Sequence, residues 1–375
     1  MAIEIREVES RKELKQFILF PFSLYKDDPR WIPPLIRGEL NTLNKKSNPS
    51  FDHCDTLFLM AIKDGKPAGR IAGIINHRYV EQWNKKDARF CWFDVVNDIE
   101  VTRALFRRLE QWAEGHGMER IVGPMGFTTF DRQGILVSGF DEMPTFSGCY
   151  NFPYYPEQMK VLGFEDEARY VEYELTVPSE VPAKILRISD LVQERYDLHI
   201  PEAKSTKDML PYAEEVFHII NAAYRPLYGF TELTEKQISY FVKKYFSYIR
   251  PEYVSVVLDR EDKVLGFQIS LPSLSTALQK ARGRLFPFGW LYLKRAMKNS
   301  RRIDTLLTGV LPEYQSKGIN AVFMTHLTKA AIHGGMQYAE SNGELAENIK
   351  VQNTWRYFER RQHRCSRLYA RDISS

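Results

Sequence analysis

A short turn near residue 315 carries the clearest chemistry in the sequence. The segment 306–311 is rich in strand-forming residues, and a helical pattern begins at Ile319. The residues between them include Gln315, Ser316, Lys317 and Gly318. A helix N-terminus leaves N–H groups free and carries the positive end of the helix dipole, so a phosphate group can bind there. Glycine lets an anion approach the backbone closely, and the lysine adds positive charge. These residues indicate either a phosphate site or an ordinary strand-to-helix turn.

The same turn resembles the Gln/Arg-x-x-Gly-x-Gly/Ala signature of the GCN5-related N-acetyltransferases. Gln315, Gly318 and Asn320 occupy its fixed positions, and Asn320 departs from the usual Gly or Ala. Asparagine is one of the few residues other than glycine that readily adopt left-handed backbone conformations. In that superfamily the turn binds the pyrophosphate of coenzyme A, and the preceding strand pairs with the pantetheine arm. The resemblance implies that acetyl-CoA or another acyl-CoA is held by Val310, Leu311, Gln315, Ser316, Lys317, Gly318, Ile319, Asn320 and, from a later motif, Asn348.

The resemblance also implies direct acyl transfer to an amine. A main-chain N–H of the strand would polarise the thioester carbonyl, and a base or a water chain would deprotonate the amine. The segment 340–358 resembles the superfamily's last motif, in which a tyrosine often protonates the departing thiolate. Tyr357 is our candidate for this acid, although an aromatic residue on an amphipathic helix is more often part of the core. The candidate bases are Glu340, Glu344 and Asp304, and we place Glu340 with Tyr357 in the predicted catalytic set.

The N-terminal half resembles a bacterial group of tandem acetyltransferase-like proteins. The residues that carry this second resemblance are Phe20-Pro21, Leu24-Tyr25, Pro29, Trp31, Asn48-Pro49, Gly69-Arg70-Ile71-Ala72, Asn76-His77, Gly123-Pro124, Gly134, Gly139-Phe140-Asp141, Pro144, Tyr150-Asn151, Tyr154-Tyr155 and Gly163-Phe164. The resemblance implies two tandem domains of α/β (α+β) class. Each would have a mixed, largely antiparallel central sheet flanked by helices.

The hydrophobic pattern predicts a similar order of elements in the two halves. Residues 178–182 are the best linker candidate, which gives an N-terminal domain of residues 1–178 and a C-terminal domain of residues 183–375. In the first half we expect strands at 3–8, 56–62, 69–76, 88–96 and 121–124, a helix that Pro21 ends, and a helix at 101–117. In the second half we expect strands at 198–200, 253–259, 264–271, 303–311, 338–341 and 367–373, and helices at 209–228, 237–249, 319–334 and 351–361.

The first half lacks the phosphate-binding signature at the corresponding place. After the strand at 88–96 the chain reads Asn97-Asp98-Ile99-Glu100, and two acidic residues at a helix N-terminus would repel phosphates. We therefore expect the first domain not to bind CoA. Its segment 123–155 is rich in glycine and aromatic residues and is either a structural loop or the lining of an acceptor cleft. The residues predicted to contact the acceptor are Asp131, Arg132, Tyr150 and Tyr154.

The segment 280–302 concentrates positive charge. It contains Lys280, Arg282, Arg284, Lys294, Arg295, Lys298, Arg301 and Arg302 without any acidic residue, interleaved with Phe286, Phe288, Trp290 and Tyr292. Three interpretations are open. The favoured one is a solvated helix with a buried aromatic face; the others are a membrane-surface helix and a site for RNA or an acidic acceptor.

Length and composition set wider bounds. The 375 residues suggest two domains, and a net charge of +4 does not indicate DNA binding. The four scattered cysteines predict neither disulfides nor a zinc site, and they fit a reducing cytosol. The histidines have no metal-ligand spacing, and no apolar run is as long as a membrane span. We expect a cytoplasmic protein without a metal.

The predicted function is N-acyl transfer from an acyl-CoA to an amine on a small molecule or peptide. One alternative is an enzyme similar to the aminoacyl-tRNA-dependent peptidyltransferases, for which the basic segment 280–302 would matter. The other is a non-catalytic acyl-CoA-binding or scaffold protein.

Overall fold

The structure is a computed structural model that describes residues 2–373. The chain forms two compact units. Unit 1 comprises Met1–Val171, Ser275–Tyr292 and Arg364–Ser375, and unit 2 comprises Glu172–Leu274 and Leu293–His363. The predicted linker lies in the loop between β7 (Glu165–Thr176) and α6 (Ala183–Tyr196). The domain boundary there stays a prediction, because unit 1 also includes two shorter segments from the second half of the chain.

Unit 1 contains a mixed sheet whose strands follow the order β1-β2-β3-β4-β5-β13. The strands are β1 (Ile3–Glu7), β2 (Cys54–Lys63), β3 (Lys66–Asn76), β4 (Asp87–Val95), β5 (Arg120–Gly123) and the C-terminal part of β13 (Arg360–Asp372). Only β4 and β5 pair in parallel among these neighbours. A short strand, β6 (Ile135–Ser138), pairs with β13. The predicted hairpin at 56–76 is confirmed: it turns at Asp64 and Gly65, both with positive φ, as tight hairpins favour.

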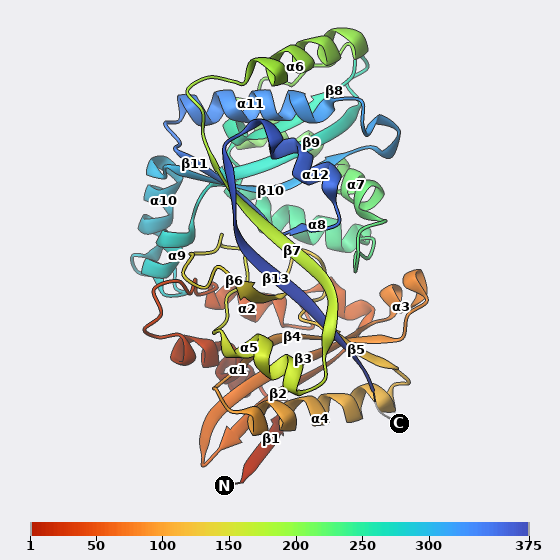
Figure 1. The fold of residues 1–375 in the computed structure, drawn as a ribbon, viewed down its shortest axis with the longest axis vertical. Helices are drawn as coiled ribbons and strands as arrows, with labels where there is room; N and C mark the ends of the chain where they lie inside the picture. The colour runs from red at the N-terminus through yellow and green to blue at the C-terminus, as the bar shows by residue number, and fades with distance from the viewer. Residues whose placement is uncertain (1, 374–375) are drawn as a thin grey trace. The chain divides into compact units, whose positions relative to one another are not determined.

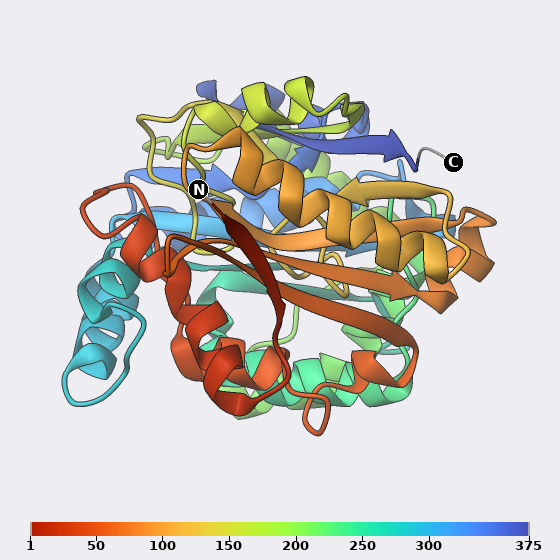
Figure 2. The same cartoon turned by 90° about the horizontal axis from the view of Figure 1, so that it is seen from below.

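Helices cover both faces of this sheet (Figures 1 and 2). The helices of unit 1 are α1 (Arg11–Leu24), α2 (Ile36–Thr42), α3 (His77–Trp83), α4 (Ile99–Gly115), α5 (Tyr154–Val161), α9 (Ser275–Ala281) and the start of α10 (Gly289–Asn299). Alternate residues of β2 pack into two separate hydrophobic clusters, one on each face of the sheet. Leu57 and Leu59 pack with α4, while Phe58 and Met60 pack with α1, because successive side chains of a strand point to opposite faces.

The prediction that Pro21 ends the first helix is wrong. Proline removes one helical N–H donor and disturbs the carbonyl four residues earlier, and α1 continues through Pro21 to Leu24. That earlier carbonyl belongs to Phe17, and Arg70 Nη1 donates a hydrogen bond to its oxygen at 2.8 Å. The Tyr25 N–H closes the helix by donating to Pro21 O at 2.9 Å. A residue from β3 thus satisfies the acceptor that the proline leaves without a partner.

The strands of unit 2 follow one another in the order β7-β11-β10-β9-β8, with mixed parallel and antiparallel pairing. Its own strands are β8 (Val254–Leu258), β9 (Val264–Pro272), β10 (Arg302–Val310) and β11 (Tyr338–Ser341), and β12 (Glu344–Leu345) pairs with β7. The pair β10–β11 is parallel, while β8–β9, β9–β10 and β7–β11 are antiparallel. The helices are α6, α7 (Ala213–Tyr224), α8 (Glu235–Tyr245), α11 (Ile319–His333), α12 (Ile349–Gln352) and the end of α10. Short 3₁₀ turns include η2 (Thr206–Tyr212), η5 (Pro312–Tyr314) and η6 (Asn353–Tyr357).

Three predictions in the second half need correction. The expected strand at 198–200 is a single bridge between His199 and Leu258. The expected helix at 209–228 starts as the 3₁₀ turn η2, which contains Pro211, and continues as α7. The expected helix at 351–361 is also wrong, because α12 has four residues, η6 follows, and β13 begins at Arg360. The Glu359 carbonyl there accepts a hydrogen bond from Thr176 N–H at 3.0 Å, so strand pairing overrides the helical pattern.

The predicted repeat of architecture is confirmed. In unit 1 the antiparallel strands β3 and β4 are followed by α4 and then by β5, which is parallel to β4. In unit 2 the antiparallel strands β9 and β10 are followed by α11 and then by β11, which is parallel to β10. Within residues 2–373, no helix has the length and apolarity needed to cross a bilayer.

Candidate functional site

The turn after β10 leads into the N-terminus of a long helix, which is a place where an anion can bind. The strand ends at Val310, the turn η5 follows, and α11 begins at Ile319 and runs for 15 residues. The first N–H groups of such a helix have no intrahelical acceptor and lie at the positive end of its dipole. Gln315 Nε2 donates to Val310 O at 3.3 Å, which ties the turn to the strand. The sequence prediction of a strand, a turn and a helix in this order is therefore confirmed.

Gly318 is required here by backbone conformation and by packing. Its φ is +90°, a region that favours glycine. A Cβ atom at this position would lie 2.8 Å from Val192 Cγ2 and 3.5 Å from Ile188 Cγ2. Both of these residues belong to α6, so the glycine brings α6 close to the start of α11. Packing therefore adds a structural reason for a glycine that the sequence analysis connected with the close approach of an anion.

The remaining residues of the turn are open to solvent. Ser316, Lys317 and Asn320 are exposed, and Ser316 has a positive φ of 63°. Lys317 Nζ lies 4.5 Å from the centre of the Tyr314 ring and 5.7 Å from that of Tyr196. These cation–π contacts hold the Lys317 side chain beside the helix N-terminus.

From residue 306 to Val310, the edge of β10 that faces away from β9 pairs with no strand of unit 2 among the described residues. Its pairing with β11 extends from Arg302 to Thr305, and a bulge interrupts the β9 pairing between Thr305 and Leu307. On the open side, Tyr224 Oη donates to Thr308 O at 2.9 Å. Burial raises the pKa of Tyr224 to about 12. The sequence analysis missed Tyr224, because nothing along the chain shows that the end of α7 meets this strand.

Two acidic residues lie in register where β10 and β11 separate. Asp304 and Glu340 are paired across the parallel strands, and Arg302 forms ion pairs with Glu340 and with Glu174 of β7. Burial raises the pKa of Glu340 to about 7 and raises that of Asp304 well above its ordinary value. Both carboxyl groups therefore bind a proton more readily than exposed ones do.

Glu344 lies three residues beyond the end of β11 and has a simpler environment. Trp355 Nε1 donates to Glu344 Oε1 at 2.6 Å, while the buried Oε2 has no hydrogen-bond partner within the described chain. Burial raises the pKa of Glu344 to about 7. Asn348 caps α12 by accepting a hydrogen bond from Val351 N–H at 3.4 Å, so its side-chain oxygen is already in use.

Tyr357 packs in the apolar cluster that includes Trp355 and, on α11, Ala321 and Met324. Its hydroxyl oxygen is buried without a hydrogen-bond partner in the part of the chain that the structure describes. The Lys184 Nζ atom lies 5.2 Å from the centre of its ring. The structure therefore places Tyr357 near the first turns of α11, in the same apolar cluster as Trp355, which donates a hydrogen bond to Glu344.

The equivalent place in unit 1 is occupied by the protein's own side chains. Asp98 caps α4 by accepting from Glu100 N–H at 3.0 Å and forms an ion pair with Lys63, whose hydrogen bond lowers the pKa of Asp98. At the end of β4, Tyr154 Oη donates to Val95 O at 2.6 Å and Val95 N–H donates to Tyr155 Oη at 2.8 Å. Side chains of unit 1 thus bond both the N–H and the carbonyl of Val95 at the end of β4, whereas on β10 side chains bond the carbonyls of Thr308 and Val310.

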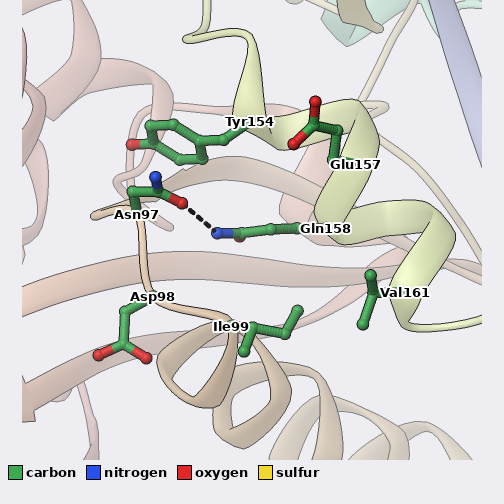
Figure 3. Close-up of a pocket in the computed structure, with 7 residues that line it drawn as sticks. All are labelled: Asn97, Asp98, Ile99, Tyr154, Glu157, Gln158 and Val161. Atoms are coloured by element: carbon green, nitrogen blue, oxygen red, sulfur yellow. Dashed lines mark hydrogen bonds between the residues drawn. The ribbon is translucent and has the colours of Figure 1, made fainter.

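A pocket of about 460 Å³ lies beside this capped helix (Figure 3). Its lining residues are Asn97, Asp98, Ile99, Tyr154, Glu157, Gln158 and Val161. Gln158 Nε2 donates to Asn97 Oδ1 at 3.3 Å, as the dashed line in Figure 3 shows. Two carboxylates in the lining and no basic residue make the pocket unfavourable for a phosphate.

The four predicted acceptor residues all belong to unit 1, where each forms hydrogen bonds. Tyr150 Oη donates to Asp28 Oδ2 at 2.6 Å, and Tyr154 binds Val95 O. Asp131 accepts from Thr128 N–H at 3.1 Å. Arg132 donates to the Ile32 and Phe146 carbonyls at 3.1 and 2.9 Å, and burial lowers its pKa. These bonds are those of an ordered structural loop, and the acceptor role stays a prediction.

No group of His, Cys, Asp and Glu side chains within residues 2–373 is arranged to hold a metal ion. All four cysteines are buried and none forms a disulfide within the described residues, and burial raises the pKa of the Cys54 thiol to about 12.

Comparison with known proteins adds two relatives and a structural match. No family model matches the chain. Protein YghO of Escherichia coli (strain K12) is 29% identical over 330 residues, which cover 87% of this chain and 83% of that protein. The bacterial ceramide synthase of Caulobacter vibrioides (strain NA1000 / CB15N) is 26% identical over 354 residues, or 92% and 90% of the two chains.

Among solved structures, a tandem GNAT protein from the clavulanic acid biosynthesis pathway, determined without acetyl-CoA, aligns with 100% of this chain and 99% of its own. The TM-score is 0.56 and the sequence identity is 13%. The match extends over both units, each of which has the strand and helix order described above. The chain therefore has the tandem fold of the GCN5-related N-acetyltransferases, which the turn at Gln315–Asn320 and the resemblance of the N-terminal half together predicted.

Proposed function

We propose that the chain is an acyl-CoA-dependent N-acyltransferase whose donor site lies in unit 2. The observation that carries the proposal is the junction of β10 with α11. There, free helix N–H groups and Lys317 stand at the end of a strand with an open edge. A diphosphate can bind at such a helix N-terminus, and an extended amide chain can pair with such a strand edge. In unit 1 the matching positions are bonded to Asp98, Tyr154 and Tyr155.

The proposed binding mode follows from this junction. The pyrophosphate would lie on the N–H groups of residues 318–320 with Lys317 beside it. The pantetheine arm would run along the open edge of β10, next to Thr308 and Tyr224. The bulge between Thr305 and Leu307 would then present a main-chain N–H to the thioester carbonyl, and such a donor stabilises the oxyanion that develops in acyl transfer.

For the general base, the contacts favour Glu344 over the sequence candidate Glu340. The Glu340 carboxylate is held by Arg302, which also binds Glu174, whereas one oxygen of Glu344 has no partner within the described residues. The pKa of Glu344, raised to about 7, is close to the value that suits a base at neutral pH. Glu340 remains the base predicted from the sequence and is tested alongside it.

The proposed reaction transfers one acyl group. The amine nitrogen attacks the thioester carbonyl carbon and gives a proton to Glu344. The carbon–sulfur bond breaks, and Tyr357 protonates the thiolate. The products are an amide and free CoA, and solvent exchanges the protons of the two side chains afterwards. No redox step or metal is required.

For the acceptor, we propose the amine of a long-chain amino alcohol and, for the donor, a fatty acyl-CoA. The support is the ceramide synthase of Caulobacter vibrioides, whose similarity extends over 92% of this chain. A ceramide is the fatty amide of such an amino alcohol, and its amide bond is the one that an acyl-CoA-dependent N-acyltransferase forms.

The first test measures donor binding. CoA and palmitoyl-CoA should raise the melting temperature of the protein, and Asn320→Asp should abolish this rise. The new carboxylate repels the pyrophosphate but favours the helix, because acidic residues stabilise a helix N-terminus. The matched control is Asn44→Asp, an exposed position in unit 1 whose side-chain oxygen accepts from Lys46 N–H. A thermal shift that persists in Asn320→Asp would remove this turn from the donor site.

The second test measures turnover. Release of free CoA thiol is followed with acetyl-CoA and palmitoyl-CoA against long-chain amino alcohols, short amines and peptides. The proposal expects turnover with the long-chain amine, and Glu344→Gln and Tyr357→Phe should reduce kcat more than Glu340→Gln. Binding of CoA without turnover for any amine would instead indicate a non-catalytic protein.

A further inference from the structure

The basic segment follows α9 and comprises the turn between α9 and α10 together with most of α10. We use the name basic aromatic hairpin for residues 282–298, which are the loop after α9 and most of α10 (Figure 1). Its start is fixed within unit 1. The Ile36 N–H donates to Gly283 O at 2.9 Å, and Ser275 Oγ donates to Pro144 O at 3.0 Å. A Cβ atom at Gly283 would lie 2.6 Å from the Phe22 ring, so the backbone contacts α1 closely here.

The apolar side chains of the hairpin are exposed. Phe286 has 83% of its surface exposed and Phe288 has 63%. The other large exposed hydrophobic residues of the hairpin are Leu285, Trp290, Leu291 and Tyr292. Leu293 is buried. The favoured sequence interpretation, a solvated helix with a buried aromatic face, is therefore wrong, because the aromatic residues face the solvent. Exposed apolar patches of this kind mark interaction sites in folded proteins.

The charges around this apolar surface have one sign. Six basic residues flank it in the sequence, and all six are exposed: Lys280, Arg282, Arg284, Lys294, Arg295 and Lys298. No acidic residue occurs from residue 280 to residue 302. Trp290 Nε1 donates to Pro287 O at 3.0 Å, which holds the indole at the start of α10. A partner that fits must therefore offer negative charge next to an apolar region.

We infer that the basic aromatic hairpin binds the surface of an anionic lipid bilayer. Exposed Phe, Trp and Leu side chains would enter the boundary between headgroups and acyl chains, and the surrounding Lys and Arg side chains would contact anionic headgroups. Single-stranded RNA would also attract the positive charge and stack on aromatic rings. It offers nothing, however, to the exposed aliphatic residues Leu285 and Leu291. The observations therefore favour lipid.

This inference does not depend on the proposed acyl transfer. Membrane binding could hold for any activity of the chain, and the acyltransferase could act on a dispersed amine. If both are correct, the hairpin brings the enzyme to the surface where a long-chain amine resides. Vesicle binding is measured without acyl-CoA or amine, so its failure leaves the donor-site test unaffected.

The experiment measures co-sedimentation of the full chain with vesicles of phosphatidylcholine, alone or mixed with phosphatidylglycerol, over a range of salt concentrations. Binding is expected only to the anionic vesicles, and it should weaken as salt rises. The variant Phe286→Ser/Phe288→Ser should bind on the order of tenfold more weakly. Lys294→Gln/Arg295→Gln should lose roughly fivefold for each charge removed. Emission from Trp290, isolated as the difference from Trp290→Phe, should shift to the blue on binding.

The matched control for the apolar change is Leu191→Ser/Leu210→Ser, which replaces two leucines that are 54% and 52% exposed elsewhere. This control should bind like the parent protein, and the serine variants should keep the parent's melting temperature because the altered side chains are exposed. Equal vesicle binding by the hairpin variants and the control would overturn the inference. Absence of binding to anionic vesicles, or hairpin-dependent binding of single-stranded RNA in its place, would overturn it too.

Discussion

The indole of Trp355 donates a hydrogen bond of 2.6 Å to Glu344 Oε1, while the second oxygen of the same carboxyl group stays buried without a partner in the described chain. Burial raises the pKa of Glu344 to about 7. The hydrogen bond from Trp355 thus fixes the orientation of the Glu344 carboxyl group, and its Oε2 atom can take up a proton.

This raised pKa predicts a pH-dependent stability. In the unfolded chain a glutamate ionises near pH 4.3, so between about pH 4 and pH 7 the unfolded state releases this proton while the folded state keeps it. The free energy of unfolding should therefore fall over this range, by roughly 3–4 kcal/mol for this group, and then level off. Chemical denaturation across this range should show a smaller fall in Glu344→Gln. Glu340 contributes in the same direction, so an unchanged slope in Glu344→Gln would mean that Glu344 ionises normally.

Tyr357→Phe should separate a catalytic role from a structural one. The buried hydroxyl has no partner within residues 2–373, so its removal should leave the melting temperature unchanged or slightly higher. If Tyr357 is the acid, kcat should fall on the order of 10²-fold, within the range typical of general acids. Tyr173→Phe is the control, because Tyr173 Oη donates to Gln352 at 3.2 Å in the same unit. Wild-type turnover in Tyr357→Phe would assign this tyrosine to the core alone.

Gly318→Ala should destabilise the fold by about 1–3 kcal/mol, because the new Cβ is strained at φ +90° and meets Val192. Adding Val192→Ala should restore the stability lost to the steric clash, while the stability lost to backbone strain at residue 318 should remain lost. Gly115→Ala, at the end of α4 with nothing within 4 Å of the new Cβ, should be neutral or stabilising. Guanidinium unfolding of these variants and the parent protein checks this. Equal stability of Gly318→Ala and Gly115→Ala would contradict the close packing of α6 against α11.

Arg70→Met should destabilise the chain by about 3–5 kcal/mol. Arg70 is buried, forms a 2.7 Å ion pair with Asp94 and donates to Phe17 O, the carbonyl that Pro21 leaves free. Its loss leaves a buried carboxylate and a buried carbonyl without this donor. Replacing Pro21 with Ala in the Arg70→Met background should restore part of the stability, since an alanine N–H can donate to Phe17 O. No gain from the second change would show that Arg70 acts through Asp94 alone.

The sequence by itself determined the local features. The sequence around Gln315–Asn320 indicated a strand, a turn and a helix in this order, as the structure has them, and the acids at Asp98 and Glu100 indicated that the first half lacks the same turn residues. Both follow from short-range rules on backbone conformation and charge at helix ends, so neighbouring residues were enough to predict them. The repeated order of elements followed from hydrophobic periodicity in the same way.

Tertiary structure decided what depends on residues distant in the chain. Pro21 stays within a helix because Arg70 supplies the missing donor, and the segment after Gln352 leaves the helix because Glu359 pairs with β7. Distant residues also decide the two strand edges. Tyr154 and Tyr155 bond the end of β4, whereas the pairing of β11 with β10 stops at Thr305. Burial of Glu344 and exposure of the basic aromatic hairpin are also properties of packing. Side-chain type and spacing are local, but burial, pKa and the availability of a hydrogen-bonding group depend on which distant segments come together.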